Sequence, residues 1–176
     1  MKKEVRPLIG KNLERVVDYF LNLTPEDDLR MGSDRKNFMS QDEWIKLLID
    51  DSQKPLHKRK FFYLGWFLDD HLIGHCNINK IIYGQEAFIH LHLWMLKLRE
   101  QGLGSDFLIK AVDFYFKNFK LERILCEPKS DNPGPNKTLV KCGFKLLKTY
   151  KTKPSILSVK HEVHLYELNR LANKQY

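Results

Sequence analysis

Residues 93–108, LWMLKLREQGLGSDFL, carry the strongest structural signal in the chain. They run from an apolar strand through a short R-x-x-G-x-G connection into a helix. Gly102 and Gly104 can adopt backbone angles that other residues avoid, and they let the main chain approach a ligand closely. The first-turn N–H groups of the following helix have no intrahelical acceptor and lie at the positive end of its dipole. The segment therefore predicts a pyrophosphate site, although neither the P-loop nor the G-x-G-x-x-G pattern is present.

Helix and strand signals alternate on both sides of this segment. Apolar spacing and capping residues predict helices over residues 12–23, from Ser40 onward, and over 106–119 and 135–141, with Thr24-Pro25 ending the first. Alternating apolar residues and turn signals predict strands over residues 61–68, 72–82, 87–95, 124–127, 144–152 and 156–168. The strand at 87–95 is apolar on both faces, so we expect it at the centre of the sheet. The element order predicts a mixed α/β fold, with a central, mostly antiparallel sheet covered by helices on both faces.

Composition is that of a globular protein. The chain has 176 residues, 43% of them hydrophobic and 30% charged, which fits one domain over residues 1–176 and excludes disordered and collagen-like classes. No apolar run approaches the ~18 residues of a membrane span, and no signal sequence is evident at the start, so we expect a cytoplasmic protein. Cys76, Cys126 and Cys142 form no C-x-x-C pair, which indicates reduced core residues rather than disulfides or a zinc site.

The positive charge lies mainly in the C-terminal part. Residues 1–100 hold 16 basic and 15 acidic residues, whereas residues 101–176 hold 14 and 7. Residues 129–153 contain seven lysines and one acid, Asp131. Such a run can face nucleic acid, a phosphorylated cofactor or water.

A second motif follows the glycine segment by about 30 residues: Asn132, a short helix, and then Gly143-Phe144 at the start of a strand. With R-x-x-G-x-G and the element order over residues 10–168, it resembles the GNAT N-acetyltransferase superfamily, and most closely its ribosomal-protein and N-terminal branches. That resemblance implies a GNAT-like fold and an enzyme that moves an acetyl group from acetyl-CoA to a primary amine in a ternary complex. The implied partners are acetyl-CoA and an amine acceptor, a small amine or a protein N-terminus, with no metal, no membrane and no nucleic acid. A ribosome-associated acceptor, and a monomer or a homodimer, both remain open.

The resemblance also implies cofactor contacts. Backbone groups of the strand end would meet the pantetheine arm, the R-x-x-G-x-G segment would hold the pyrophosphate, and Asn132 would contact the pantetheine end. A strand N–H near Trp94 is the candidate oxyanion donor. The implied cofactor-binding residues are Leu93, Trp94, Met95, Arg99, Glu100, Gln101, Gly102, Leu103, Gly104, Ser105 and Asn132.

Three residues are candidate catalytic groups. Glu127 lies five residues before Asn132, where relatives that act on protein N-termini have a glutamate, so it is the first candidate for the general base. A solvated glutamate at a strand end is the alternative. His90 and His92 share one face of the central strand, and a histidine that titrates near neutral pH suits proton transfer. Ordinary core histidines are the alternative for them, and the H-x-H pair has no evident third metal ligand.

The sequence departs from the family at one functional position. Many relatives have a tyrosine four residues before the Gly-Phe pair, as acid for the thiolate, and this chain has Leu139. Tyr83, Tyr150 or a water would then supply the proton, or the thiolate leaves unassisted. On the acceptor side, the resemblance suggests Arg30, Arg35, Trp44 and Trp66, and the final strand offers His161, Glu162 and His164.

Two other functions are open. The missing tyrosine would fit a non-catalytic acyl-CoA sensor of the same fold. The lysine run would fit a nucleic-acid-binding module, but no recognition motif or interleaved aromatic pattern accompanies it.

Overall fold

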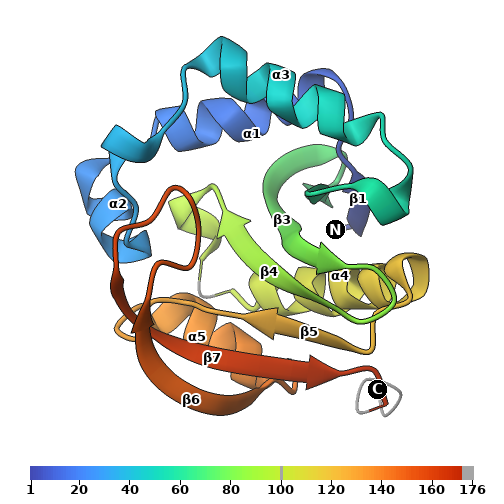
Figure 1. Ribbon diagram of the computed structural model, residues 1–176, viewed down its shortest axis with the longest axis vertical. Coiled ribbons are helices and arrows are strands. Elements are labelled where there is room, and N and C mark those ends of the chain that lie inside the picture. The colour runs from blue at the N-terminus through green and yellow to red at the C-terminus, as the bar shows by residue number, and fades with distance from the viewer. Residues whose placement is uncertain (100, 172–176) are drawn as a thin grey trace.

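A seven-stranded sheet organises the chain, which a computed structural model describes over residues 1–99 and 101–171 (Figure 1). The strand order is β1-β2-β3-β4-β5-β7-β6, and only β4 and β5 pair in parallel. The strands are β1 (Lys3–Pro7), β2 (Phe62–Leu68), β3 (His71–Ile82), β4 (Glu86–Leu93), β5 (Arg123–Cys126), β6 (Lys145–Thr152) and β7 (His161–Asn169). The mixed α/β fold and the central position of β4 are thus as predicted.

Helices cover both faces of the sheet. Helices α1 (Lys11–Leu21) and α3 (Gln41–Ser52) lie side by side on one face, and α4 (Leu103–Phe119) lies on the other (Figure 1). Leu13, Val16 and Val17 of α1 pack in one apolar cluster, whereas the buried stripe of α4 packs against β2 to β5 in a larger one. The remaining helices are α2 (Pro25–Met31) and α5 (Pro133–Lys141), with 3₁₀ turns at Arg35–Asn37, Leu56–Lys58 and Leu96–Leu98.

The N-terminal region differs from the prediction in two places. Residues 3–7 form β1, which pairs antiparallel with β2 and which the short polar pattern did not reveal. Thr24-Pro25 was predicted only as the end of a helix, but it also begins α2. The Thr24 hydroxyl accepts a hydrogen bond from the Asp27 N–H, and Pro25 is the first residue of α2. Proline is tolerated in a first helical turn because that N–H lacks an intrahelical partner. The predicted capping box of Ser40 and Glu43 begins α3 as expected.

Strands β4 and β5 separate soon after they meet. Their pairing extends only from Glu86–Arg123 to Phe88–Leu125. Beyond Phe88, the β5-side edge of β4 pairs with no strand among the described residues, and the chain after β5 pairs with β7 instead, through Lys129 and Val163. A wedge therefore opens between β4 and residues 127–132. It lies directly before the glycine turn that starts α4.

The three cysteines are buried and unpaired, as expected from their spacing. Over residues 1–99 and 101–171, no helix combines the length and the apolar character that crossing a bilayer requires.

Candidate active site

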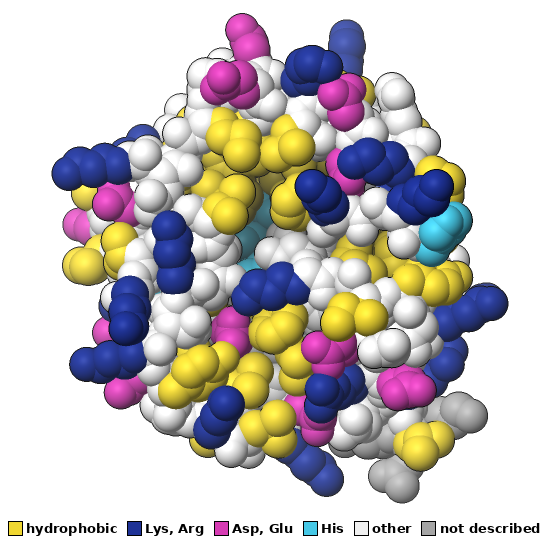
Figure 2. Space-filling view, in the orientation of Figure 1, with side chains coloured by type: hydrophobic (Ala, Val, Ile, Leu, Met, Phe, Trp, Pro, Cys, Tyr) yellow, Lys and Arg dark blue, Asp and Glu magenta, His cyan; other side chains and the backbone are white. Residues whose placement is uncertain are grey.

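A cavity of about 1760 Å³ crosses the sheet at this wedge. Its lining includes Lys58 and Lys60, ahead of β2, the middle of β3 and β4, and the start of α5. Figure 2 shows Lys and Arg side chains around a central hollow in which a histidine surface is visible. The cavity is large enough for two ligands to meet, since a drug-sized ligand site is commonly ~300–1,000 Å³.

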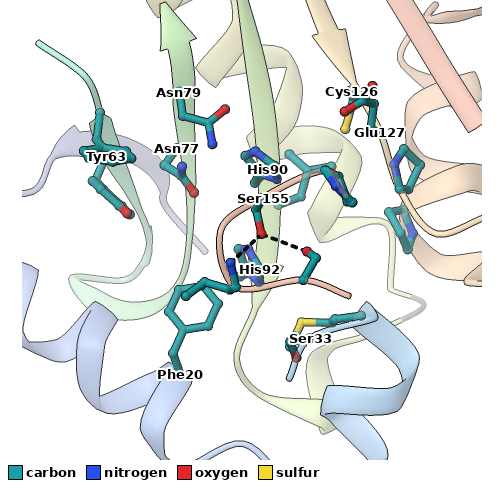
Figure 3. A pocket seen from close by; sticks show the side chains of 18 of the residues that line it. Phe20, Ser33, Tyr63, Asn77, Asn79, His90, His92, Cys126, Glu127 and Ser155 are labelled. Atoms are coloured by element: carbon teal, nitrogen blue, oxygen red, sulfur yellow. Dashed lines mark hydrogen bonds between the residues drawn. The ribbon is translucent and has the colours of Figure 1, made fainter. Parts of the chain in front are cut away.

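Polar side chains from two neighbouring strands form the floor of the cavity. Asn77 of β3 lies directly opposite His90 of β4, and His75 lies opposite His92. Residues opposite each other in an antiparallel pair share a face, so the four side chains form two rows. Figure 3 shows Asn77, Asn79 and His90 pointing into the same space, with Glu127 on the far side. Nε2 of His90 and Nδ1 of His92 are buried without a hydrogen-bond partner among the described residues.

His75, His90 and His92 share this face of the sheet, and their pKa values are lowered, although only His90 and His92 line the cavity. Burial, and to a smaller extent the Lys80 ammonium, lower the pKa of His90 to about 4. Burial likewise lowers the pKa of His75 to about 3, and it holds the pKa of His92 well below 6.5. The expectation of a histidine that titrates near neutral pH is therefore wrong for His90 and His92. Their free ring nitrogens can hydrogen-bond a ligand, but they are weak proton acceptors at pH 7.

Glu127 is the one acidic side chain among the described residues that line the cavity. It is 8% exposed, at the end of β5. Its Oε1 accepts a hydrogen bond from the Tyr150 hydroxyl, and its Oε2 lies 3.5 Å from Nζ of Lys80. Burial and the Glu127 carboxylate raise the pKa of Tyr150 to about 12, so this hydroxyl keeps its proton at neutral pH. Neither tyrosine considered as acid, Tyr83 or Tyr150, is among the lining residues, but Tyr150 reaches the cavity through its hydrogen bond to Glu127.

The glycine turn has the geometry of an anion site. Gly102 is the N-cap of α4 at φ 77°, a conformation that favours glycine, and no side chain caps the helix. The helix therefore begins at Leu103, three residues before the predicted start. The Ser105 N–H donates to Gly102 O over 3.1 Å, which leaves the N–H groups of Leu103 and Gly104 without an intrahelical acceptor. Nζ of Lys141 lies 3.7 Å from where a Cβ on Gly102 would stand. Lys141 is a site residue that the sequence analysis did not single out, although it belongs to the lysine run.

The predicted cofactor residues divide into two groups. The lining includes Leu93, Arg99, Gly102, Gly104, Ser105 and Asn132, and it does not include Trp94, Met95, Gln101 or Leu103. Glu100 lies outside the described residues. Asn132 is buried at the N-cap of α5 without a side-chain capping bond, so its amide is available to a ligand. The Arg99 side chain reaches Leu93 O at 3.4 Å and Asp27 at 3.7 Å, so it braces the turn against α2.

The β4 backbone offers a hydrogen-bond donor to the wedge. The Trp94 N–H is already bonded to Ile73 O over 3.0 Å, so it is not a free oxyanion donor. In an antiparallel ladder, successive N–H groups point to opposite edges of the strand. The Leu93 N–H therefore faces the wedge, where β4 has no strand partner. The Trp94 indole instead donates to Nδ1 of His75 over 2.8 Å and fixes that ring.

The acceptor-side predictions are mixed. Arg30, Trp44 and Trp66 line the cavity, but both tryptophans are buried, and Arg35 is bound to Asp28 and to backbone carbonyls. His161, Glu162 and His164 are not among the lining residues. The loop between β6 and β7 does line the cavity, and it is tied to residues 32–37 by backbone bonds such as Asp34 N to Leu157 O. Figure 3 shows Ser155 of this loop in front of His90 and His92.

No cluster of three or more His, Cys, Asp or Glu side chains able to hold a metal occurs within residues 1–99 and 101–171. One end of the cavity thus has the N-terminus of α4 with lysines beside it. Its middle has neutral histidines and one carboxylate. Such an arrangement can bind a phosphorylated molecule and accept a proton beside it.

Comparison with known proteins agrees with this geometry. Residues 6–145 match the family model for the acetyltransferase (GNAT) domain. The probable N-acetyltransferase YjcK of Bacillus subtilis (strain 168) is 29% identical over 134 residues, which cover 68% of this chain and 74% of that protein. Among solved structures, a ribosomal L7/L12 α-N-protein acetyltransferase, RimL, in complex with coenzyme A superposes with a TM-score of 0.77 at 20% identity, over 98% and 96% of the two chains. Spermidine N-acetyltransferase from Vibrio cholerae, with CoA and spermine, gives 0.77 at 16% identity, over 98% of each chain.

Proposed function

This chain belongs to the acetyltransferase (GNAT) domain family, and we propose that it is an N-acetyltransferase that moves an acetyl group from acetyl-CoA to a primary amine. The observation that carries the proposal is the wedge between β4 and β5, which opens onto the uncapped N-terminus of α4. The neighbouring structures with bound CoA support acetyl-CoA as the donor. The unpaired cysteines support a reducing, cytoplasmic location.

Acetyl-CoA would bind along the wedge. The first-turn N–H groups after Gly102, together with Lys141, suit the pyrophosphate, because a helix N-terminus and a nearby cation both favour an anion. Asn132 and the exposed backbone edge at Leu93 suit the polar groups of the pantetheine arm. Arg99, Gly104 and Ser105, which also line the cavity, complete the proposed cofactor segment.

The reaction needs three functions from the protein. Glu127 would take the proton from the attacking amine, directly or through a water, while the amine nitrogen bonds to the thioester carbon. The Leu93 N–H would stabilise the oxyanion that forms there. When the carbon–sulfur bond breaks, the Tyr150 hydroxyl would protonate the thiolate and recover its proton through the hydrogen bond to Glu127. His90 and His92, neutral in this cavity, would orient the amine rather than deprotonate it.

The variant Glu127→Gln tests this assignment. We expect kcat to fall by ~10²-fold or more, with one limb of the pH–rate profile lost, since a general base contributes ~10²–10⁴-fold. The dissociation constant for acetyl-CoA, measured by calorimetry, should stay unchanged because Glu127 does not belong to the anion site. Glu122→Gln, an exposed carboxylate ahead of β5, is the matched control. Wild-type rates in Glu127→Gln would remove Glu127 from the mechanism.

The same experiment separates the enzyme from a sensor. The wild-type protein is incubated with acetyl-CoA and a panel of amines and peptides, and both CoA release and product mass are recorded. Tight binding of acetyl-CoA without product from any acceptor would contradict the transferase and favour the non-catalytic alternative.

A further inference from the structure

The cavity is strongly cationic. Its described lining contains ten Lys and Arg side chains and one carboxylate, that of Glu127. The chain as a whole is less biased, with 30 basic and 22 acidic residues. Four of the ten cations are ion-paired: Arg30 and Arg99 with Asp27, Lys80 with Glu127, and Lys129 with Asp131. The remaining excess lies in Lys58, Arg59, Lys60, Lys137, Lys141 and Lys153, and Figure 2 shows Lys and Arg side chains around the hollow. A cleft lined by one sign of charge attracts ligands of the other sign and repels its own.

The phosphates of acetyl-CoA account for only part of this charge. Lys137 and Lys141 lie on α5, next to the glycine turn. Lys58 and Lys60 precede β2, which is separated from β4 by β3, whereas α5 follows β5 on the other side of β4. The cations ahead of β2 therefore face the part of the cavity beyond the reaction centre.

The two β2-side lysines are exposed and form no ion pair with any carboxylate of the described residues. Their backbone, in contrast, is firmly held. The buried Asp51 carboxylate accepts hydrogen bonds from the N–H groups of Lys60 and Phe61, both at 2.9 Å. The segment thus presents uncompensated ammonium groups from a fixed position. Lys153, at the start of the loop over the cavity, adds another exposed cation.

The proposed reaction needs an amine that is free of its proton when it attacks the thioester, so the pKa of the amine restricts which acceptors suit the site. An α-amine with a pKa of ~8 is free in roughly a quarter of molecules at pH 7.5, whereas a lysine-type amine with a pKa of ~10.4 is free in roughly one in a thousand. The surrounding cations lower the pKa of a bound amine further. The site therefore suits an α-amine better than a polyamine.

We infer that the acceptor is the N-terminal α-amine of an acidic polypeptide, whose first carboxylates meet Lys58 and Lys60. This inference rests on the proposed transferase activity and adds the class of its acceptor. Polycationic amines are poor acceptors in this scheme, because they would enter a cavity that repels them.

The test compares three acceptors with the full-length protein and saturating acetyl-CoA. They are the peptide Ser-Glu-Glu-Asp-Ala, its neutral counterpart Ser-Gln-Gln-Asn-Ala, and spermidine. We expect kcat/KM for the acidic peptide to exceed that of the neutral one by about tenfold at low ionic strength, as two or three partly screened ion pairs provide. The ratio should shrink in 0.5 M NaCl, because salt at that level screens charges beyond ~4–5 Å.

Charge-reversal variants locate the effect. The double variant Lys58→Glu/Lys60→Glu should lose the preference for the acidic peptide while its calorimetric affinity for acetyl-CoA stays within twofold of wild type. Lys145→Glu/Lys151→Glu makes the same change in net charge on β6, outside the cavity lining, and should keep the preference.

The outcomes separate the two proposals. Equal or better turnover of the neutral peptide or of spermidine would overturn the acidic acceptor and leave the transferase standing. A preference that the Lys58/Lys60 variant retains would also overturn the inference. If acetyl-CoA binds and no acceptor is acetylated, the proposed function itself fails, and the inference fails with it.

Discussion

Acidification should destabilise this protein through three histidines on one face of β3 and β4. His75 is fully buried, and His90 and His92 each have a buried ring nitrogen. Desolvation lowers the pKa of each, to about 3 for His75 and about 4 for His90. In the unfolded chain the same imidazoles titrate near the ordinary value of ~6.5. At pH values between the folded-state and unfolded-state pKa values, the unfolded chain binds more protons than the folded protein does. Stability is therefore full above pH ~6.5 and falls as the pH drops toward 4.

The size of the effect follows from these pKa values. At pH 5.5, each histidine kept neutral in the folded state costs ~1.4 kcal/mol relative to pH 7.5, so the three together cost at most ~4 kcal/mol. That is a large fraction of the ~5–15 kcal/mol that stabilises an ordinary domain. His161, whose pKa burial also lowers, adds in the same direction.

Urea unfolding at pH values from 5.5 to 7.5 measures this dependence directly. The variant His90→Asn should remove about a third of the pH-dependent change in unfolding free energy. His71→Gln, at an exposed turn, should leave it as in wild type. A flat profile for the wild-type protein, or an unchanged one for His90→Asn, would refute the reasoning. His90 would then be accessible to protons near neutral pH and would return as a candidate base.

Three further perturbations probe the site. Gly102→Asp should weaken acetyl-CoA binding ~100-fold or more in calorimetry, because its carboxylate would stand at the anion site, while Gly102→Asn, of equal size and uncharged, should bind distinctly better. Lys80→Met should raise the pKa of His90 above 4 in an NMR titration, because the Lys80 charge helps to lower it; an unchanged value would contradict that contact. Asp51→Asn should cost ~2–3 kcal/mol of stability in urea unfolding, because a charged acceptor of two backbone N–H groups is lost, and a cost under ~0.5 kcal/mol would show that these bonds matter little.

Local patterns were sufficient for most of the fold. The central strand, the β2–β3 hairpin, the capping box at Ser40 and the glycine turn before α4 all depend on interactions within a few residues, and each was predicted where it occurs. β1 was missed because its five residues gain their structure from pairing with β2, more than 50 residues away. The Thr24-Pro25 pair was predicted to end the first helix, but its role in starting α2 was missed, since the same residues suit the end of one helix and the beginning of the next.

The site, like the fold, has features that depend on neighbouring residues and features that depend on distant ones. The glycine motif and the Asn132 to Gly143-Phe144 motif indicated the family, and the glycine motif predicted the turn and helix start at one end of the cavity, because a turn and the helix after it form from one continuous stretch of chain. The lowered pKa values of His90 and His92 could not be predicted from the sequence, because His92 packs against Tyr19 and Phe20 of α1 and the Lys80 charge acts on His90 from the neighbouring strand. The hydrogen bond between Glu127 and Tyr150 joins residues 23 positions apart, and the cavity lining brings together lysines as distant in the sequence as Lys58 and Lys153. Turns and helix ends depend on residues close together in the sequence, so the sequence alone predicts them. The desolvation of a side chain and the net charge of a cavity depend on which distant residues the folded sheet brings together.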